Sequence, residues 1–129
     1  MYPLFEWKLS GHKKSISTPL PEEIVLCSVV KAELLFGARK SQQVEANLQK
    51  LKLFFEPLVS LSFDDRCAEE AGLIRADLST QGKPIGPNDL LIAATARAHD
   101  AVLVTHNTDE FARVTGLRLA DWEMMKAPR

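Results

Sequence analysis

The chain has 129 residues, of which 46% are hydrophobic and 26% are charged, so it can bury one sizeable core and is expected to be a single domain spanning residues 1–129. Its 16 basic and 17 acidic side chains leave a net charge of −1, which excludes the global positive field that drives non-specific nucleic-acid binding. Any contact with phosphate must therefore be local or carried by a metal ion.

Several functional classes are excluded by what the sequence lacks. The first twenty residues contain no apolar signal core, and no run approaches the ~18 apolar residues of a membrane span. The six glycines are isolated, so there is neither a phosphate-binding P-loop nor a dinucleotide fingerprint. Cys27 and Cys67 have no zinc-ligand spacing and are expected to be reduced thiols. We therefore expect a soluble, cytoplasmic protein without a membrane partner.

Strands and helices alternate along most of the chain. Residues 1–23 form an atypical N-terminal segment, expected to be largely loop. After it come a strand at 24–28, helices at 29–36 and 41–55, a strand at 58–63, a helix at 64–79, a helix from 87, a strand at 102–105, a helical turn at 109–114 and a strand at 117–119. This order predicts an α/β fold, a three-layer α/β/α arrangement with a central parallel sheet covered by helices on both faces.

Local signals set several helix boundaries. Pro87 suits the first position of a helix, where its missing N–H is not needed, and Asp64 and Ser28 can each cap a helix start. Gly37, followed by basic residues, predicts the end of the helix from Val29. Pro57 ends the helix that begins near Ser41.

Two acids stand among apolar neighbours without a counter-charge on their own helix. The residues three and four positions from Glu33 are Val29, Val30, Phe36 and Gly37, and those around Asp89 are Ile85, Gly86, Ile92 and Ala93. Burying a lone carboxylate costs several kcal/mol unless a cation or hydrogen bonds meet it. The pair therefore suggests a shared cation. In the blander alternative Glu33 reaches solvent at a helix edge and Asp89 merely caps its helix.

A polar turn follows the strand at 102–105. In open α/β sheets ligands bind at the carboxyl ends of the strands, which makes Glu110 a candidate site acid. Thr105 and Asn107 could orient a carboxylate or a metal-bound water, although either could simply close the turn. Asp109 is expected to be a surface acid, and Arg113 lies at helical spacing from both acids.

Four segments resemble, in order and spacing, the PIN domain of VapC-type toxins. They are Cys27 to Ala38, Gly86 to Asp89, Val104 to Phe111 and Asp121 to Trp122, and the resemblance runs from about Ile24 to Trp122. The resemblance implies a ribonuclease that uses Mg²⁺ or Mn²⁺ to cleave RNA, usually forms a homodimer and is held inactive by a VapB-type antitoxin.

The resemblance also implies roles for particular residues. Glu33 and Asp89 match two of the family's catalytic metal-site acids, and Glu110 matches the acid in the turn after the fourth strand. Thr105 and Asn107 match its supporting polar residues.

The chain departs from the family at its start. The family opens with a short apolar strand ending in Asp-Thr-Asn, which is missing here, and Glu6 is the acid that precedes position 22. In PIN domains this strand lies in the middle of the sheet, and its loss would leave buried backbone groups unpaired at a cost of a few kcal/mol each. We therefore predict that Leu4 to Trp7 pairs there, between the strands at 24–28 and 102–105. Glu6 would then be an imperfect substitute for the missing metal-site aspartate, close to Glu33 and Asp89.

Three hypotheses remain. The first is a toxin-type endoribonuclease whose clustered carboxylates hold a divalent metal. The second, favoured by the missing Asp-Thr-Asn, is a degenerate PIN domain that binds an antitoxin or RNA without cleaving. The third is an unrelated α/β domain, which would leave Glu33, Asp89 and Glu110 far apart. For a second copy or an antitoxin we predict a surface formed by the helices at 41–55 and 64–79, with Phe54 either at its edge or widening the core.

Overall fold

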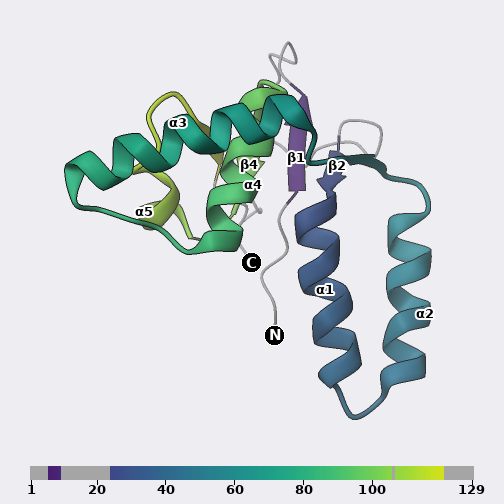
Figure 1. Cartoon of the computed structure of the whole chain (residues 1–129). Helices are drawn as coiled ribbons and strands as arrows, with labels where there is room; N and C mark the ends of the chain where they lie inside the picture. The colour runs from purple at the N-terminus through teal and green to yellow at the C-terminus, as the bar shows by residue number, and fades with distance from the viewer. Residues whose placement is uncertain (1–5, 10–23, 106, 121–129) are drawn as a thin grey trace, which may run out of the picture.

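The computed structural model describes residues 6–9, 24–105 and 107–120, and for residues 6–9 and 24 it describes the backbone alone (Figure 1). In chain order its elements are β1 (Glu6–Leu9), β2 (Ile24–Cys27), α1 (Ser28–Lys40), α2 (Val44–Phe55), β3 (Val59–Leu61), α3 (Asp65–Gln81), α4 (Pro87–Ala98), β4 (Ala101–Val104), α5 (Thr108–Phe111) and β5 (Arg118–Ala120).

The strands form one sheet in the order β3-β2-β1-β4-β5. The α/β fold is confirmed, and the pairs β2–β3 and β4–β5 are parallel as expected. The expectation of a wholly parallel sheet is wrong for its centre, because β1 runs antiparallel to both β2 and β4. Parallel neighbours need a long crossover, usually a helix, and the polar, proline-containing sequence between Leu9 and Ile24 has no helical pattern.

β1 lies in the centre of the sheet, between β2 and β4, where the sequence predicted that an N-terminal strand would pair. Its register places Glu6 opposite Val104 and Trp7 opposite both Leu103 and Val25. The predicted pairing is thus confirmed for Glu6 and Trp7, while Leu4 and Phe5 lie outside the described residues. Because β1 runs antiparallel to β2 and β4, it begins at the edge of the sheet where those two strands end. The backbone of Glu6 therefore lies at the carboxyl edge.

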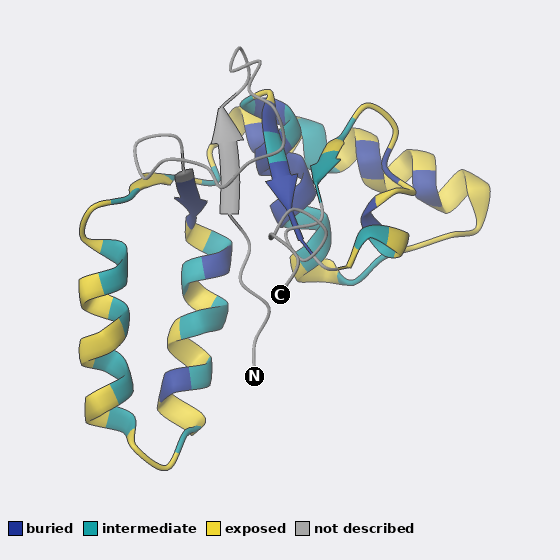
Figure 2. Ribbon diagram, turned by 180° about the vertical axis from the view of Figure 1, so that it is seen from behind, coloured by how far each residue is buried: buried dark blue, intermediate teal, exposed yellow. Residues whose placement is uncertain are grey.

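Helix α4 lies between the sheet and α3 (Figure 1). The residues from Ile92 to Ala96 are all buried, as is typical of a helix covered on every side (Figure 2). Arg97 Nε lies 2.5 Å from Glu70 Oε1 and joins α4 to α3. In the described part of the chain, no helix has both the length and the apolar character needed to cross a membrane.

Helices α1 and α2 form a hairpin, called here the α1–α2 hairpin, that extends beyond the carboxyl edge of the sheet (Figure 1). The predicted stop at Gly37 is wrong, because α1 continues to Lys40 and ends where Ser41 Oγ donates to the Ala38 carbonyl at 2.6 Å.

The cap at Asp64 is confirmed, since its side chain accepts from the Cys67 N–H at 3.1 Å. Ser28, by contrast, lies inside α1 and is not its N-cap.

The surface expected from α2 and α3 for a second copy or an antitoxin stays a prediction. In Figures 1 and 2, α2 and α3 extend in different directions and do not lie side by side. Phe54 is partly buried against the core, which agrees with the alternative that it widens the core face. The large apolar side chains exposed on the α1–α2 hairpin are instead Leu35, Phe36 and Leu53.

Candidate active site

Asp89 and Glu110 meet at the carboxyl edge of the sheet. Asp89 stands in the first turn of α4, which Gly86 and Pro87 begin as predicted, and Glu110 is carried by α5 after β4. Their carboxyl groups share a hydrogen bond. Burial, this bond and the negative charges of Glu110 and Glu33 raise the pKa of Asp89 to about 7. Asp89 is therefore the member of the pair that keeps its proton to higher pH.

Glu110 is fixed by two further donors. The backbone N–H of Gly86 donates to Oε2 at 3.1 Å, and Nδ2 of Asn107 donates to Oε1 at 2.6 Å. The hydrogen bond from Asp89 is the largest cause that lowers the pKa of Glu110, and Gly86, Asn107 and the charge of Arg113 lower this pKa further. Glu110 is thus the ionised member of the pair.

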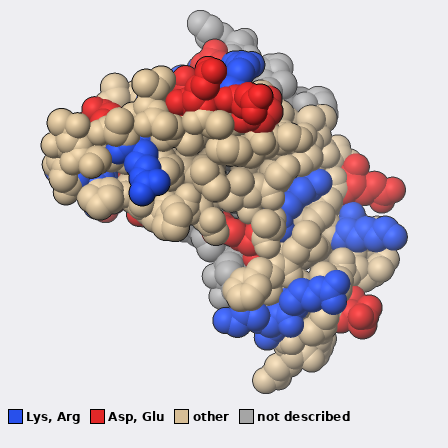
Figure 3. All heavy atoms as spheres, in the orientation of Figure 1, with Lys and Arg blue, Asp and Glu red and all other residues tan. Residues whose placement is uncertain are grey.

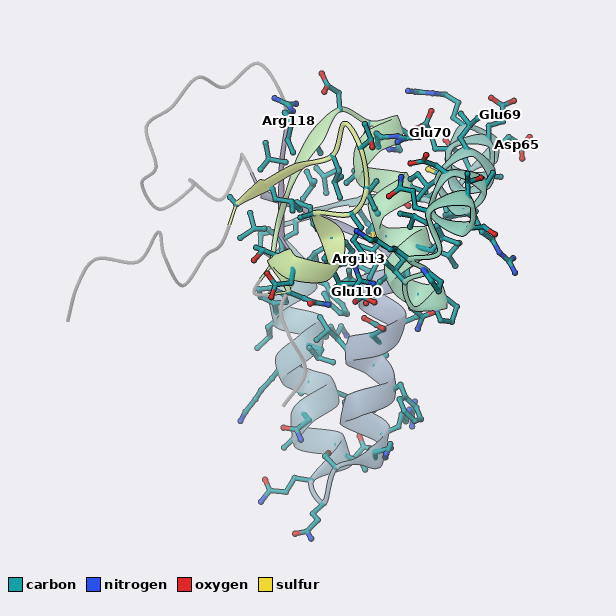
Figure 4. The ribbon with its side chains drawn as sticks, turned by 90° about the vertical axis from the view of Figure 1, so that its left-hand side faces the viewer. Asp65, Glu69, Glu70, Glu110, Arg113 and Arg118 are labelled. Atoms are coloured by element: carbon teal, nitrogen blue, oxygen red, sulfur yellow. The ribbon has the colours of Figure 1, made fainter. Side chains whose placement is uncertain are left out.

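Arg113 links α5 to the loop before α4. Its Nη1 donates to the Pro84 carbonyl at 3.0 Å, and Figure 4 shows its side chain beside Glu110. The sequence allowed Arg113 to pair with Asp109 or Glu110. Its hydrogen bond goes to the backbone instead, while its charge still acts on Glu110. Asp109 is exposed, in agreement with a surface acid.

Glu33 adjoins the pair from α1. Nδ2 of Asn88 donates to its Oε2 at 3.2 Å, so α1 and α4 are joined across the site. The charge of Glu33 contributes to the raised pKa of Asp89. Among residues 6–9, 24–105 and 107–120, however, no group of three or more His, Cys, Asp or Glu side chains is placed to hold a metal ion. The site is an Asp89–Glu110 pair with Glu33 beside it.

Thr105 and Asn107 form a chain of hydrogen bonds that leads to Glu110. Thr105 is buried, and its Oγ1 accepts the N–H of Asn107 at 3.0 Å. Asn107 in turn holds Glu110. Thr105 therefore closes the turn, and Asn107 orients the carboxylate.

The oxygen donors present fit a divalent cation. Mg²⁺ is usually bound through one or two carboxylates, with waters and substrate phosphates completing its coordination. Asp89 and Glu110 offer such a pair, and the proton that they share is one that a cation would displace. The backbone of Glu6 lies at the same edge, opposite Val104.

The cysteines offer no competing chemistry. Cys27 and Cys67 are free and buried, as the sequence predicted for reduced thiols. Burial raises the pKa of the Cys27 thiol to about 11, so the thiolate that a nucleophile requires is scarce at neutral pH.

Sequence reasoning missed the contributions of Asn88 and Gly86. The first four N–H groups of a helix have no partner within it, and this rule could have identified the Gly86 region as a donor to an acid. The contact of Asn88 with Glu33 spans 55 positions and has no local signal.

Comparisons with known proteins agree with this geometry. Residues 9–117 match the PIN domain family. The chain is 44% identical over 100 residues to the tRNA(fMet)-specific endonuclease VapC of Shigella flexneri, covering 78% of this chain and 76% of that protein. It is 42% identical over 100 residues to ribonuclease VapC2 of Rickettsia felis, covering 78% of this chain and 75% of that protein.

Solved structures give the same result. VapBC2 from Rickettsia felis, bound to a DNA fragment from their promoter, matches with a TM-score of 0.73 and 42% identity over 76% of this chain and 74% of that one. VapBC-1 from nontypeable Haemophilus influenzae matches with a TM-score of 0.74 and 38% identity over 77% of this chain and 74% of that one. The chain belongs to the PIN-domain family, and its relatives within that family are VapC ribonucleases.

Proposed function

We propose that the protein is a toxin-type endoribonuclease that hydrolyses RNA phosphodiester bonds with Mg²⁺ or Mn²⁺. The observation that carries this proposal is the meeting of the Asp89 and Glu110 carboxyl groups at the carboxyl edge of the sheet, where Gly86 and Asn107 hold Glu110. These two side chains would hold the cation, and Glu33 and Glu6 are the further acids assigned to the site. Dependence on a divalent metal is general among VapC-type PIN ribonucleases.

A bound cation would stabilise charge on the scissile phosphate and lower the pKa of a bound water. The chain's own residues supply the geometry. Asn107 and Gly86 fix both oxygens of Glu110, and Asn88 fixes Glu33. Asp89 and Glu110 would hold the cation, and binding would favour the ionised form of Asp89.

The same proposal includes partners. The similar solved structures contain VapBC pairs, one of them bound to promoter DNA. We propose from this likeness that the protein pairs with a VapB-type antitoxin, which holds it inactive. The homodimer and the action on RNA in the cytoplasm are proposed from the resemblance of the sequence to VapC-type toxins. Apolar side chains that are exposed in the single chain, such as Val59 and Leu73, are the kind that such interfaces cover.

A second function is supported by the N-terminus. The chain lacks Asp-Thr-Asn, and its central strand runs antiparallel to both of its neighbours. These observations favour a PIN domain that binds an antitoxin or RNA but cleaves weakly or not at all.

An RNA cleavage assay with Mg²⁺, Mn²⁺ or chelator separates the two functions. The endoribonuclease cleaves in a metal-dependent way, and Asp89→Asn lowers the rate by more than about 100-fold, because losing a direct ligand costs at least as much as losing its support. Glu69→Gln removes an exposed acid of α3, away from the site, and serves as the matched control (Figure 4).

A version with an apolar strand and Asp-Thr-Asn at its start completes the design. If it cleaves and the natural chain does not, the protein is the degenerate form. If neither cleaves, the endoribonuclease proposal is wrong.

A further inference from the structure

A hollow of about 350 Å³ continues from the site along α1. Its lining residues are Val29, Ala32, Glu33, Phe36 and Asn88. Four of them belong to α1 and the fifth to the first turn of α4, and Asn88 is the residue that holds Glu33. The volume is at the low end of the range of about 300–1,000 Å³ found for small-molecule sites, enough for one planar base. The hollow is therefore adjacent to the acids that would act on a phosphate.

Phe36 gives this hollow an exposed aromatic wall. Its side chain is 58% exposed, although most phenylalanines are buried. Lys40 Nζ lies 5.3 Å from the centroid of its ring. An exposed ring with a cation beside it is the combination with which proteins bind single-stranded nucleic acids, where bases stack on the ring and the cation meets the backbone.

The charge of the surrounding surface supports the same occupant. The α1–α2 hairpin and its loop carry five Lys or Arg side chains and two Glu, although the whole chain has a net charge of −1. Figure 3 shows basic side chains along the hairpin, with acidic ones among them, and a group of acidic side chains on the same face near the start of α3. A polyanion that leaves the acidic site along α1 therefore meets positive charge.

We propose that this hollow is a nucleobase subsite, in which a base of the RNA flanking the scissile phosphate stacks on Phe36. Asn88 faces the edge of that base, and Lys40 meets a backbone phosphate. The inference rests on the proposed ribonuclease function and adds a substrate class to it. A base can stack on a side chain when it is unpaired, so the subsite selects single-stranded RNA over duplex RNA.

The test compares Phe36→Ala, Phe36→Trp and Leu53→Ala in cleavage of a short single-stranded RNA. Stacking is worth about 1–3 kcal/mol per base, so Phe36→Ala should raise KM by about 5- to 150-fold, while Phe36→Trp keeps KM near that of the parent. Leu53 is a matched control, because it is 61% exposed on the same hairpin but does not line the hollow. RNA should also quench the fluorescence of the Phe36→Trp variant more than that of the parent.

The outcomes separate this inference from the function on which it rests. If the parent cleaves and Phe36→Ala leaves KM unchanged, or Leu53→Ala raises KM equally, the subsite is wrong and the ribonuclease stands. If Phe36→Ala weakens the binding of a protein partner alone, the hollow serves that partner and the subsite is again wrong. If the parent neither binds nor cleaves RNA, both fail.

Discussion

Nδ2 of Asn107 lies 2.6 Å from Oε1 of Glu110 and is held in that place by Thr105, whose Oγ1 accepts the Asn107 N–H at 3.0 Å. The acid that meets Asp89 is thus positioned by a chain of two hydrogen bonds that begins at a buried threonine. Site geometry here depends on neutral side chains as well as on carboxylates.

Asn107→Ala should lower kcat/KM for RNA cleavage by about 10- to 100-fold. It removes a hydrogen bond to an ionised carboxylate, and loss of such support costs this much in metal sites. The measurement is steady-state cleavage of one oligonucleotide at saturating Mn²⁺. Asp109→Ala alters the exposed neighbouring acid and should leave the rate unchanged. Equal losses in both variants would contradict the role of Asn107.

The thermal stability of the metal-free protein should fall as pH rises from about 4 to about 7. The pKa of Asp89 is raised from 3.8 to about 7, so in this window the folded protein binds more protons than the unfolded chain. The free energy of unfolding therefore decreases until Asp89 is ionised in both states. Glu110 acts oppositely at lower pH: because its pKa is lowered, its stabilisation is lost as pH falls below its unfolded value. With chelator present, the melting temperature of Asp89→Asn should change less with pH above pH 4 than that of the parent protein. If the two proteins show the same pH dependence, the raised pKa does not belong to Asp89.

Mn²⁺ at millimolar concentration should raise the melting temperature by several degrees at pH 7.5. A ligand that binds the folded site alone adds about 2.7 kcal/mol to the free energy of unfolding at 100 times its Kd. Asp89→Asn should abolish this rise, whereas Glu69→Gln should keep it. A rise that persists in Asp89→Asn would place the cation elsewhere.

Glu6→Ala should reduce both metal-dependent cleavage and the Mn²⁺-induced rise in melting temperature. The register puts the Glu6 backbone opposite Val104, next to the turn that leads to Glu110. Lys8→Ala, in the same strand but opposite Val102, is the control. Full cleavage by Glu6→Ala would show that Glu6 does not replace the missing aspartate.

The acid pair could be predicted because its signals are local. Asp89 and Glu110 each stand at an element boundary, and the carboxyl-edge rule for α/β sheets brings such boundaries together. Gly37 was wrongly predicted to end α1, because the low helix propensity of glycine is a weak signal that tertiary context overrides. The alternating pattern of β1 does not predict its direction, because it is the same in either direction; the signal lay in the connection after Leu9, which has no helical pattern for a parallel crossover. The Asn88–Glu33 contact depends on how α1 and α4 approach one another, which no local pattern encodes.

The N-terminal strand has two tasks, to pair with β2 and β4 in the centre of the sheet and to carry an acid to the edge. In the family, by the resemblance described above, the strand that ends in Asp-Thr-Asn does both. Neighbouring strands lie about 4.8 Å apart, so a strand between β2 and β4 keeps these two about 10 Å apart whichever way it runs. Glu33 is carried by α1, which follows β2, and Glu110 by α5, which follows β4, so the pairing of β1 with both strands spaces the elements that carry these acids. Backbone pairing at this position therefore needs no particular side chain at the edge, whereas the proposed metal site depends on which side chain β1 carries there. A substitution at the end of β1 would therefore alter the proposed metal site and leave the pairing of the sheet intact.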